Sequence, residues 1–158
     1  MTTFATAQRK HARVIHDFLA DCARAGEVLP RPIHEIRHHI ADFIVAMDPD
    51  NRVIGCVALR DYGKGLFEVR SLVVDEGNRG QGLGSRLVMQ CLELAVKRGA
   101  HSLFALTYHP DLFTRQGFAV VPKERFPQKV WADCRHCAKQ DRCDEIALVI
   151  DLTRPTGE

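Results

Sequence analysis

The sequence lacks any long apolar run. No stretch approaches the ~18 uninterrupted apolar residues that a membrane-spanning helix requires, and residues 1–12 are polar and basic, unlike a secretory signal peptide. We therefore expect a cytoplasmic protein, in which thiols stay reduced and disulfides are rare.

A surplus of one charge sign is absent as well. The chain has 22 Lys and Arg against 20 Asp and Glu, so its formal net charge is +2. A dedicated nucleic-acid-binding protein normally shows a strong basic surplus, so we expect neither nucleic acid nor a membrane as partner. The 158 residues, 46% hydrophobic and 27% charged, fit one globular domain over residues 1–158 and leave no room for a second full domain.

Apolar spacing and turn residues predict an α/β domain. Helical spacing occurs in residues 8–25, in a segment after Pro32 that contains Ile33, Ile36 and Ile40, and in a long stretch from Leu83 to about Gly99. A short helix is expected at residues 109–117. The predicted strands are 42–47, 52–59, 66–74, 102–108, 118–121 and 145–152, with an irregular insertion at about 122–144. This order predicts a mixed, mostly antiparallel sheet with one parallel crossover through the long helix.

The most informative segment is the glycine-rich turn between the strand 66–74 and the long helix, which reads Arg79-Gly80-Gln81-Gly82-Leu83-Gly84-Ser85. Its glycines let the backbone approach a ligand, and the following helix offers unpaired N–H groups to a phosphate or diphosphate. A nucleoside-triphosphate loop is excluded because no Lys follows Gly84. A dinucleotide-binding fingerprint is weak because Ser85 takes the place of its third glycine. A plain turn before an amphipathic helix is the remaining alternative.

Two motifs resemble those of the GNAT acetyltransferases. The turn from Arg79 to Gly84 is similar to the family signature Arg/Gln-x-x-Gly-x-Gly/Ala, and Ser71-Leu72-Val73-Val74-Asp75 resembles its lead-in. Phe113-x-x-x-Gly117-Phe118 resembles the later Tyr-x-x-x-Gly-Phe motif. The order of elements agrees, so the resemblance covers nearly the whole chain and implies a single GNAT domain that uses acetyl-CoA as cosubstrate, with a homodimer as its expected assembly.

The resemblance also implies how acetyl-CoA is held. The strand residues Leu72, Val73 and Val74 are expected to hydrogen-bond the pantetheine arm. The diphosphate is expected to lie on Arg79, Gly80, Gln81, Gly82, Leu83, Gly84 and Ser85. A nest of backbone N–H groups binds an anion whatever side chains surround it, so the physical chemistry agrees.

A closer resemblance is to the short type of bacterial N-acetylglutamate synthase, which lacks a kinase-like domain. It is carried by residues 28–31, 68–74, 103–108 and 126–131, and by the cysteine-containing segment 133–145. It implies acetyl transfer from acetyl-CoA to the α-amino group of L-glutamate, the entry to arginine biosynthesis. Two alternatives stay open: a GNAT enzyme for another small amine or a protein N-terminus, and a module that binds acetyl-CoA or a metal without catalysis.

The resemblance assigns Glu68 as the general base, acting directly or through a water. Without it, a solvent-facing strand Glu paired with an Arg would be the commoner explanation. Many GNAT enzymes protonate the leaving thiolate with a Tyr where this chain has Phe113, which carries no acidic proton. Thr107 and Tyr108 are the candidate substitutes, although thiolate is a good enough leaving group to depart without an acid.

An amino-dicarboxylate acceptor requires cationic partners, and Arg binds a carboxylate through two parallel hydrogen bonds. The candidates are Arg31, Arg70 and Lys129, each of which, taken alone, would more often be a solvated surface cation. Arg70 lies two residues after Glu68, so both side chains are expected on the same face of their strand.

The six cysteines divide into two groups. Cys22, Cys56 and Cys91 stand in apolar surroundings and are expected in the core. The spacing of Cys134, Cys137 and Cys143 permits a zinc site, but three thiols fall one ligand short, which favours a loop without metal; a redox disulfide ranks third. His34 and His38 share a helix face but lack an accompanying His-Glu-x-x-His pattern, which favours a solvated face.

Overall fold

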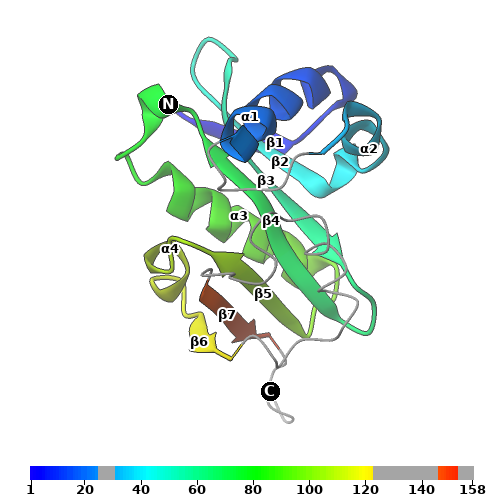
Figure 1. The fold of residues 1–158 in the computed structure, drawn as a ribbon, viewed down its shortest axis with the longest axis vertical. Helices are drawn as coiled ribbons and strands as arrows, with labels where there is room; N and C mark the ends of the chain where they lie inside the picture. The colour runs from blue at the N-terminus through cyan, green and yellow to red at the C-terminus, as the bar shows by residue number, and fades with distance from the viewer. Residues whose placement is uncertain (25–30, 123–145, 153–158) are drawn as a thin grey trace.

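The computed structural model describes residues 1–24, 31–122 and 146–152. These form a seven-stranded sheet in the order β1-β2-β3-β4-β5-β7-β6 (Figure 1). The strands are β1 (Thr3–Thr6), β2 (Phe43–Met47), β3 (Val53–Asp61), β4 (Leu66–Val74), β5 (Ser102–Thr107), β6 (Ala119–Val121) and β7 (Ile146–Asp151).

Helices pack on both faces of this sheet (Figure 1). The α-helices are α1 (Ala12–Arg24), α2 (Ile33–His38), α3 (Leu83–Lys97) and α4 (Asp111–Thr114), and the 3₁₀ turns are η1 (Arg9–His11), η2 (Ile40–Asp42) and η3 (Glu76–Asn78). Helices α1 and α2 share a core cluster with Phe43 and Val45, whereas α3 and α4 share another with Ile44 and Ala46. Alternate residues of β2 therefore face opposite helix layers, which explains why this strand is apolar throughout.

Strand β4 pairs with β5 in parallel, and every other strand pair described is antiparallel. The predicted mostly antiparallel sheet with one parallel crossover is thus confirmed. The parallel ladder joins Leu66–Glu68 only to Ser102–Phe104. Beyond Glu68, β4 diverges from β5 (Figure 1), and no other described strand pairs with that edge of β4.

A β-bulge interrupts β4 at the point where it diverges. Arg70 lies opposite Ala58 and Val73 opposite Cys56, so Ser71 and Leu72 together face Val57. Ser71 has φ = 54°, in the left-handed region that only glycine enters without strain. The extra residue reverses the alternation, which places Val73 on the same face as Glu68 and Arg70.

Some predicted boundaries were wrong. Strand β1 was not predicted because it is a mostly exposed edge strand without an alternating apolar pattern. The first predicted helix begins later, at Ala12, after the turn η1, and α2 ends at His38, so Ile40 lies in η2 instead. Over the described residues no helix is both long and apolar enough to cross a membrane.

Candidate active site

Glu68 lies in β4 and is only 8% exposed. The hydroxyl of Tyr62 donates a hydrogen bond of 2.8 Å to its Oε1. The Nε of Arg70 lies 3.6 Å from the same oxygen, which confirms that the two side chains share a face. The alternative of a solvent-facing glutamate paired with an Arg is wrong about exposure, since Glu68 is buried, and right about the pairing, since Arg70 is its partner. A carboxylate buried to this degree requires charged or hydrogen-bonding partners of this kind.

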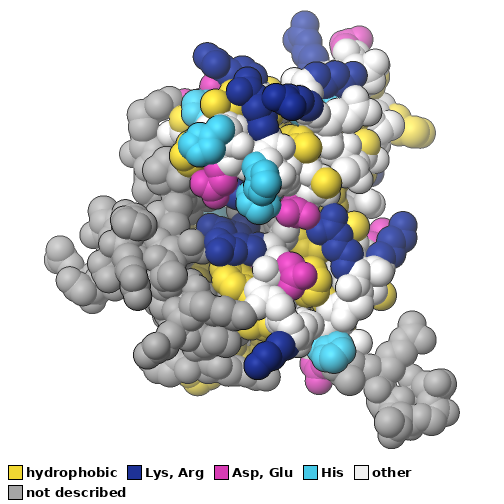
Figure 2. Space-filling view, turned by 90° about the vertical axis from the view of Figure 1, so that its right-hand side faces the viewer, with side chains coloured by type: hydrophobic (Ala, Val, Ile, Leu, Met, Phe, Trp, Pro, Cys, Tyr) yellow, Lys and Arg dark blue, Asp and Glu magenta, His cyan; other side chains and the backbone are white. Residues whose placement is uncertain are grey.

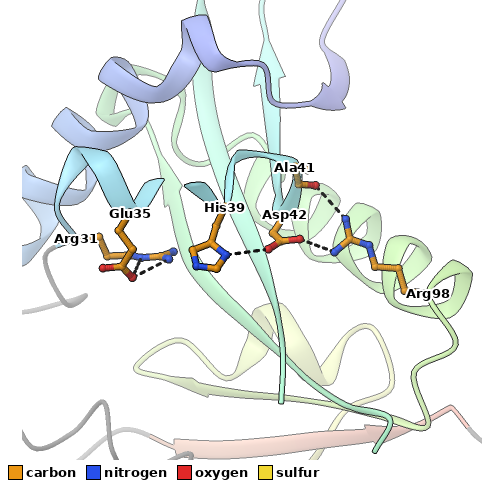
Figure 3. Close-up of polar contacts among 6 residues, drawn as sticks. All are labelled: Arg31, Glu35, His39, Ala41, Asp42 and Arg98. Atoms are coloured by element: carbon orange, nitrogen blue, oxygen red, sulfur yellow. Dashed lines mark hydrogen bonds and ion pairs between the residues drawn. The ribbon is translucent and has the colours of Figure 1, made fainter. Parts of the chain in front are cut away.

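Arg31 lies just before α2 and its side chain is 10% exposed. Its Nε and one terminal nitrogen donate to Oε1 of Glu35 at 3.2 and 3.1 Å (Figure 3). Its guanidinium lies 5.3 Å from the centre of the Phe43 ring. Burial is the main cause that lowers the pKa of Arg31, followed by repulsion from Arg70, while Glu35 acts in the opposite direction. Arg31 and Arg70 are therefore close enough to repel each other.

The segment that carries Arg31 continues through α2 to η2, and η2 makes polar contacts of its own. Arg98, at the end of α3, donates to Oδ1 of Asp42 at 2.7 Å and to the carbonyl of Ala41 at 3.0 Å. His39 faces the other carboxylate oxygen of Asp42 at 3.5 Å (Figure 3). These contacts are one third exposed or more, so each contributes little to stability. Their effect is to fix η2, which follows α2, to the C-terminal end of α3.

A third arginine, Arg60, joins Arg31 and Arg70 at this site. Arg60 in β3 is the direct cross-strand partner of Glu68, and its charge adds to the repulsion that lowers the pKa of Arg31. Arg60 and Tyr62 were not predicted from the sequence, because their proximity to Glu68 depends on the register between β3 and β4. Among the described residues, this site thus combines three guanidinium groups with two carboxylates, those of Glu35 and Glu68, and that positive surplus favours an anionic ligand.

The glycine-rich loop follows β4 after the short turn η3. Gly80 and Gly82 have φ values of 82° and 76°, and a Cβ at either position would meet no atom within 4 Å. The backbone conformation, and not crowding within the chain, therefore requires glycine here. Gly82 immediately precedes α3, whose first turn points N–H groups out of the loop. The Nε of Arg79 donates to the carbonyl of Val74 at 3.2 Å and ties the loop to the end of β4.

Gly84 and Ser85 lie inside the first turn of α3, not in the open loop. A Cβ on Gly84 would lie 3.4 Å from Leu112 of α4, so this glycine permits the two helices to pack closely. The hydroxyl of Ser85 is buried, and among the described residues it has no hydrogen-bond partner. Leu83 is buried in the core. The predicted diphosphate segment is therefore exposed from Arg79 to Gly82 and packed from Leu83 onward.

The candidate proton donors lie at the end of β5. The Oγ1 of Thr107 accepts a hydrogen bond of 2.9 Å from the backbone N–H of His109. Tyr108, the next residue, is half-buried. Phe113 is 2% exposed and packs edge-on against Phe118, with ring centres 5.3 Å apart. Phe113 therefore serves as an apolar anchor for α4.

The cysteine predictions are confirmed in part. Cys22, Cys56 and Cys91 are buried in the core, as predicted. Burial raises the pKa of the Cys56 and Cys91 thiols to about 12, so both remain protonated at neutral pH. Within the described ranges no group of His, Cys, Asp or Glu is arranged to hold a metal. Lys129, Cys134, Cys137 and Cys143 lie outside the described residues.

The surface offers two further observations. His34 and His38 are exposed, as predicted, and so is His39. The face drawn in Figure 2 carries basic and acidic side chains interspersed over its middle. A groove of about 300 Å³ lies between β1 and α3, lined by Phe4, Ile44, Gln90, Glu93, Leu94 and Lys97 among others. It lies on the α3 face of the sheet, so it is separate from the face that carries Glu68.

The fold and the loop define the class of protein. Residues 12–118 match the model of the acetyltransferase (GNAT) family, more than half of the chain, so the protein belongs to the GNAT acetyltransferase family. An uncharacterised N-acetyltransferase of Chlorobaculum tepidum is 39% identical over 96% of this chain and 97% of its own. An amino-acid acetyltransferase of Mycobacterium tuberculosis is 31% identical, over 61% of this chain and 58% of its own.

Solved structures confirm the predicted fold. The N-acetylglutamate synthase of Neisseria gonorrhoeae, complexed with coenzyme A and N-acetylglutamate, superposes on 98% of this chain with a TM-score of 0.85 and 23% identity. This chain spans only 36% of that enzyme's length. A Mycobacterium tuberculosis protein solved with CoA superposes over 96% of this chain and 99% of its own, with a TM-score of 0.82 and 22% identity.

Proposed function

We propose that this protein transfers the acetyl group of acetyl-CoA to the α-amino group of L-glutamate, the first step of arginine biosynthesis. The observation that carries the proposal is a buried carboxylate, Glu68, on the strand that leads towards the glycine-rich loop, with Arg70 of the same strand and Arg60 of β3 beside it. Strand β4 thus carries an acid–base group near its start and leads towards an anion-binding loop beyond its end.

Acetyl-CoA is the proposed donor. The exposed loop residues Arg79–Gly82 and the start of α3 through Ser85 are the proposed diphosphate site, because the left-handed glycines and the helix N-terminus direct N–H groups outward. The proposed partners of the pantetheine arm are Leu72, Val73 and Val74, on the edge of β4 that diverges from β5. An extended ligand can pair with such an edge as an additional strand does.

The acceptor site is proposed to consist of Arg31, Arg70 and Arg60, with Lys129 as a further candidate outside the described residues. Arg31 and Arg70 are 10% and 14% exposed, so a carboxylate bound between them loses little strength to solvent screening. Two buried guanidinium groups that repel each other bind an anion more tightly than either alone. Glutamate supplies two carboxylates and the reacting amine, which suits a site with several cations.

The proposed reaction begins when Glu68, directly or through a water, takes a proton from the α-ammonium group. The neutral amine then attacks the thioester carbonyl of acetyl-CoA, forming the new C–N bond. The C–S bond breaks next, and the thiolate of CoA leaves with its electron pair. Thr107 or Tyr108 is proposed to pass a proton to that sulfur, since Phe113 cannot, and to recover the second proton that the nitrogen loses as the intermediate collapses to the amide.

Two comparisons support this choice of acceptor: the similarity to the mycobacterial amino-acid acetyltransferase and the structural likeness to the gonococcal synthase. The proposal includes a cytoplasmic location and a single catalytic domain over residues 1–158. It also includes a homodimer. The cofactor is acetyl-CoA alone, without a metal.

A thiol-release assay with acetyl-CoA across the amino acids tests the proposal. We expect the highest kcat/KM with glutamate and lower values with glutamine and aspartate. Robust turnover of polyamines or peptide N-termini with none of glutamate would support the other GNAT alternative. Acetyl-CoA binding without thiol release for any amine would instead support a non-catalytic module.

A further inference from the structure

The turn that joins β3 to β4 places a tyrosine beside Glu68. The backbone N–H of Tyr62 donates to the carbonyl of Leu66 at 2.9 Å, which closes the hairpin. Asp61 accepts a hydrogen bond of 2.7 Å from the backbone of Gly63 and stabilises the same turn. Because Arg60 lies directly opposite Glu68, Tyr62 lies diagonally across from it on the same face.

The Tyr62 side chain is held from several directions. It is 7% exposed, and its ring packs on Phe104 with centres 5.8 Å apart. The guanidinium of Arg60 lies 4.7 Å from the centre of the same ring. With the ring so constrained, its hydroxyl remains within 2.8 Å of Oε1 of Glu68.

We propose that Tyr62 is a positioning residue for the base: its hydroxyl orients the Glu68 carboxylate and stabilises the charged form, while Arg60 and Phe104 hold the tyrosine ring. The inference rests on the proposed role of Glu68 as general base. A donor on one carboxylate oxygen restricts rotation of the whole group and thereby directs it towards the acceptor amine.

The positive charges beside Glu68 also stabilise its charged form. Arg70, whose Nε lies 3.6 Å from Oε1 of Glu68, and Arg60, directly opposite Glu68 on β3, favour the charged carboxylate. Burial, followed by the charge of Glu68, raises the pKa of Tyr62 well above its ordinary value. The tyrosine therefore stays protonated, and remains a donor, throughout the pH range in which the carboxylate titrates.

Carbon NMR of side-chain carboxyl groups tests the inference without turnover. The Glu68 signal is assigned by its loss in Glu68→Gln. Tyr62→Phe removes only the hydroxyl and is expected to raise the pKa of Glu68 by roughly 1 unit, the size of one lost hydrogen bond to a charged group. Phe104→Leu removes part of the packing against the Tyr62 ring but keeps the hydroxyl. It is expected to lower Tm and to raise the pKa of Glu68 by less than Tyr62→Phe does. An unchanged Glu68 pKa in Tyr62→Phe would overturn the inference.

The pH profile of kcat/KM separates this inference from the proposed function. The fall of kcat/KM at low pH follows protonation of Glu68. Tyr62→Phe is therefore expected to shift this acid limb to higher pH by roughly 1 pH unit. If Glu68→Gln retains the wild-type acid limb, the proposed base is wrong. If Glu68→Gln loses the limb but Tyr62→Phe leaves it in place, only the role of Tyr62 is wrong.

A second form of the experiment leaves the shape of the side chain nearly intact. The chain has two tyrosines, so in a Tyr108→Phe background 3-fluorotyrosine labels position 62 alone. Fluorination makes the phenol a stronger donor and is expected to lower the Glu68 pKa, opposite to Tyr62→Phe. A shift in the same direction as Tyr62→Phe, or no shift, would contradict the proposed hydrogen bond.

Discussion

At the scale of single residues, the main result is the environment of Glu68. Its sequence position within an apolar strand indicates only that it shares a face with Arg70. Burial to 8% exposure and the hydroxyl of Tyr62 turn that carboxylate into a constrained group. Constrained, partly desolvated carboxylates beside arginines are the kind of group that carries acid–base chemistry.

Glu68→Gln is expected to lower kcat by a factor on the order of 10² or more, because an amide cannot accept the amine proton. Acetyl-CoA affinity, measured by calorimetry, should change little, since the diphosphate loop is untouched. Glu93→Gln, the same substitution at an exposed position of α3, is the matched control. Equal kcat in both variants would exclude Glu68 as the base.

Arg31→Lys is expected to raise the KM for glutamate by roughly tenfold, since an ammonium group cannot form the two parallel hydrogen bonds of a guanidinium. The control is Arg13→Lys, which alters an exposed Arg–Asp pair at 3.7 Å on α1. Steady-state kinetics at saturating acetyl-CoA measures both. A KM equal to that of the wild type would remove Arg31 from the proposed acceptor site.

Gly82→Val is expected to weaken acetyl-CoA binding by more than about tenfold, because a β-branched residue resists φ = 76° and turns loop N–H groups away from the diphosphate. Gly77→Ala is the control: Gly77 lies in the turn η3 just before the loop, where an added Cβ meets only Asp75 at 3.9 Å. Titration calorimetry gives both affinities. Tight binding by the valine variant would locate the diphosphate elsewhere.

At the scale of elements, β4 determines the architecture of the site. Its first residues pair with β5, its bulge at Ser71 reverses the alternation, and its last residues lead into the loop. Without the bulge, Leu72 and Val74 would face the α1–α2 layer instead of the α3 cluster in which they pack. Because of the bulge, β4 carries Glu68 and Arg70 on one face, while Leu72 and Val74 at its end pack against α3 on the other face.

Ser71→Val is expected to destabilise the protein by about 1–2 kcal/mol, because a β-branched residue is strongly disfavoured at positive φ. Ser71→Asn is the matched variant and should be close to neutral, since Asn tolerates this conformation. Urea unfolding measures both free energies. If the two variants are equally stable, the backbone at Ser71 is not strained in solution.

At the scale of the whole molecule, helix layers cover both faces of the sheet, and the charged cluster lies on the face that α1 and α2 cover. Arg31 comes from the segment before α2, Arg60 from β3 and Arg70 from β4, so no single element forms the acceptor site. Phe43 beneath Arg31 and Phe104 beneath Tyr62 connect this cluster to the core on either side. The site therefore depends on the packing of the α2 segment on this face and on the register of β3, β4 and β5.

The three-cysteine segment yields a prediction for the intact chain. We expect zinc well below one atom per chain in protein purified without metal affinity, because Cys134, Cys137 and Cys143 provide one thiol fewer than a closed structural site. Elemental analysis by mass spectrometry measures the stoichiometry. One zinc per chain that survives dialysis against a chelator would show that another side chain completes the site.

Local patterns in the sequence were sufficient for the elements and for the loop. Apolar periodicity located α3 and β4, and the glycines of residues 80–84 indicated an anion-binding turn, because backbone conformation depends mainly on neighbouring residues. The burial of Glu68, the strand register that places Arg60 and Tyr62 beside it, and the approach of Arg31 to Arg70 were decided by tertiary structure. These contacts join segments distant in sequence, and they form only when the helix layers close over the sheet.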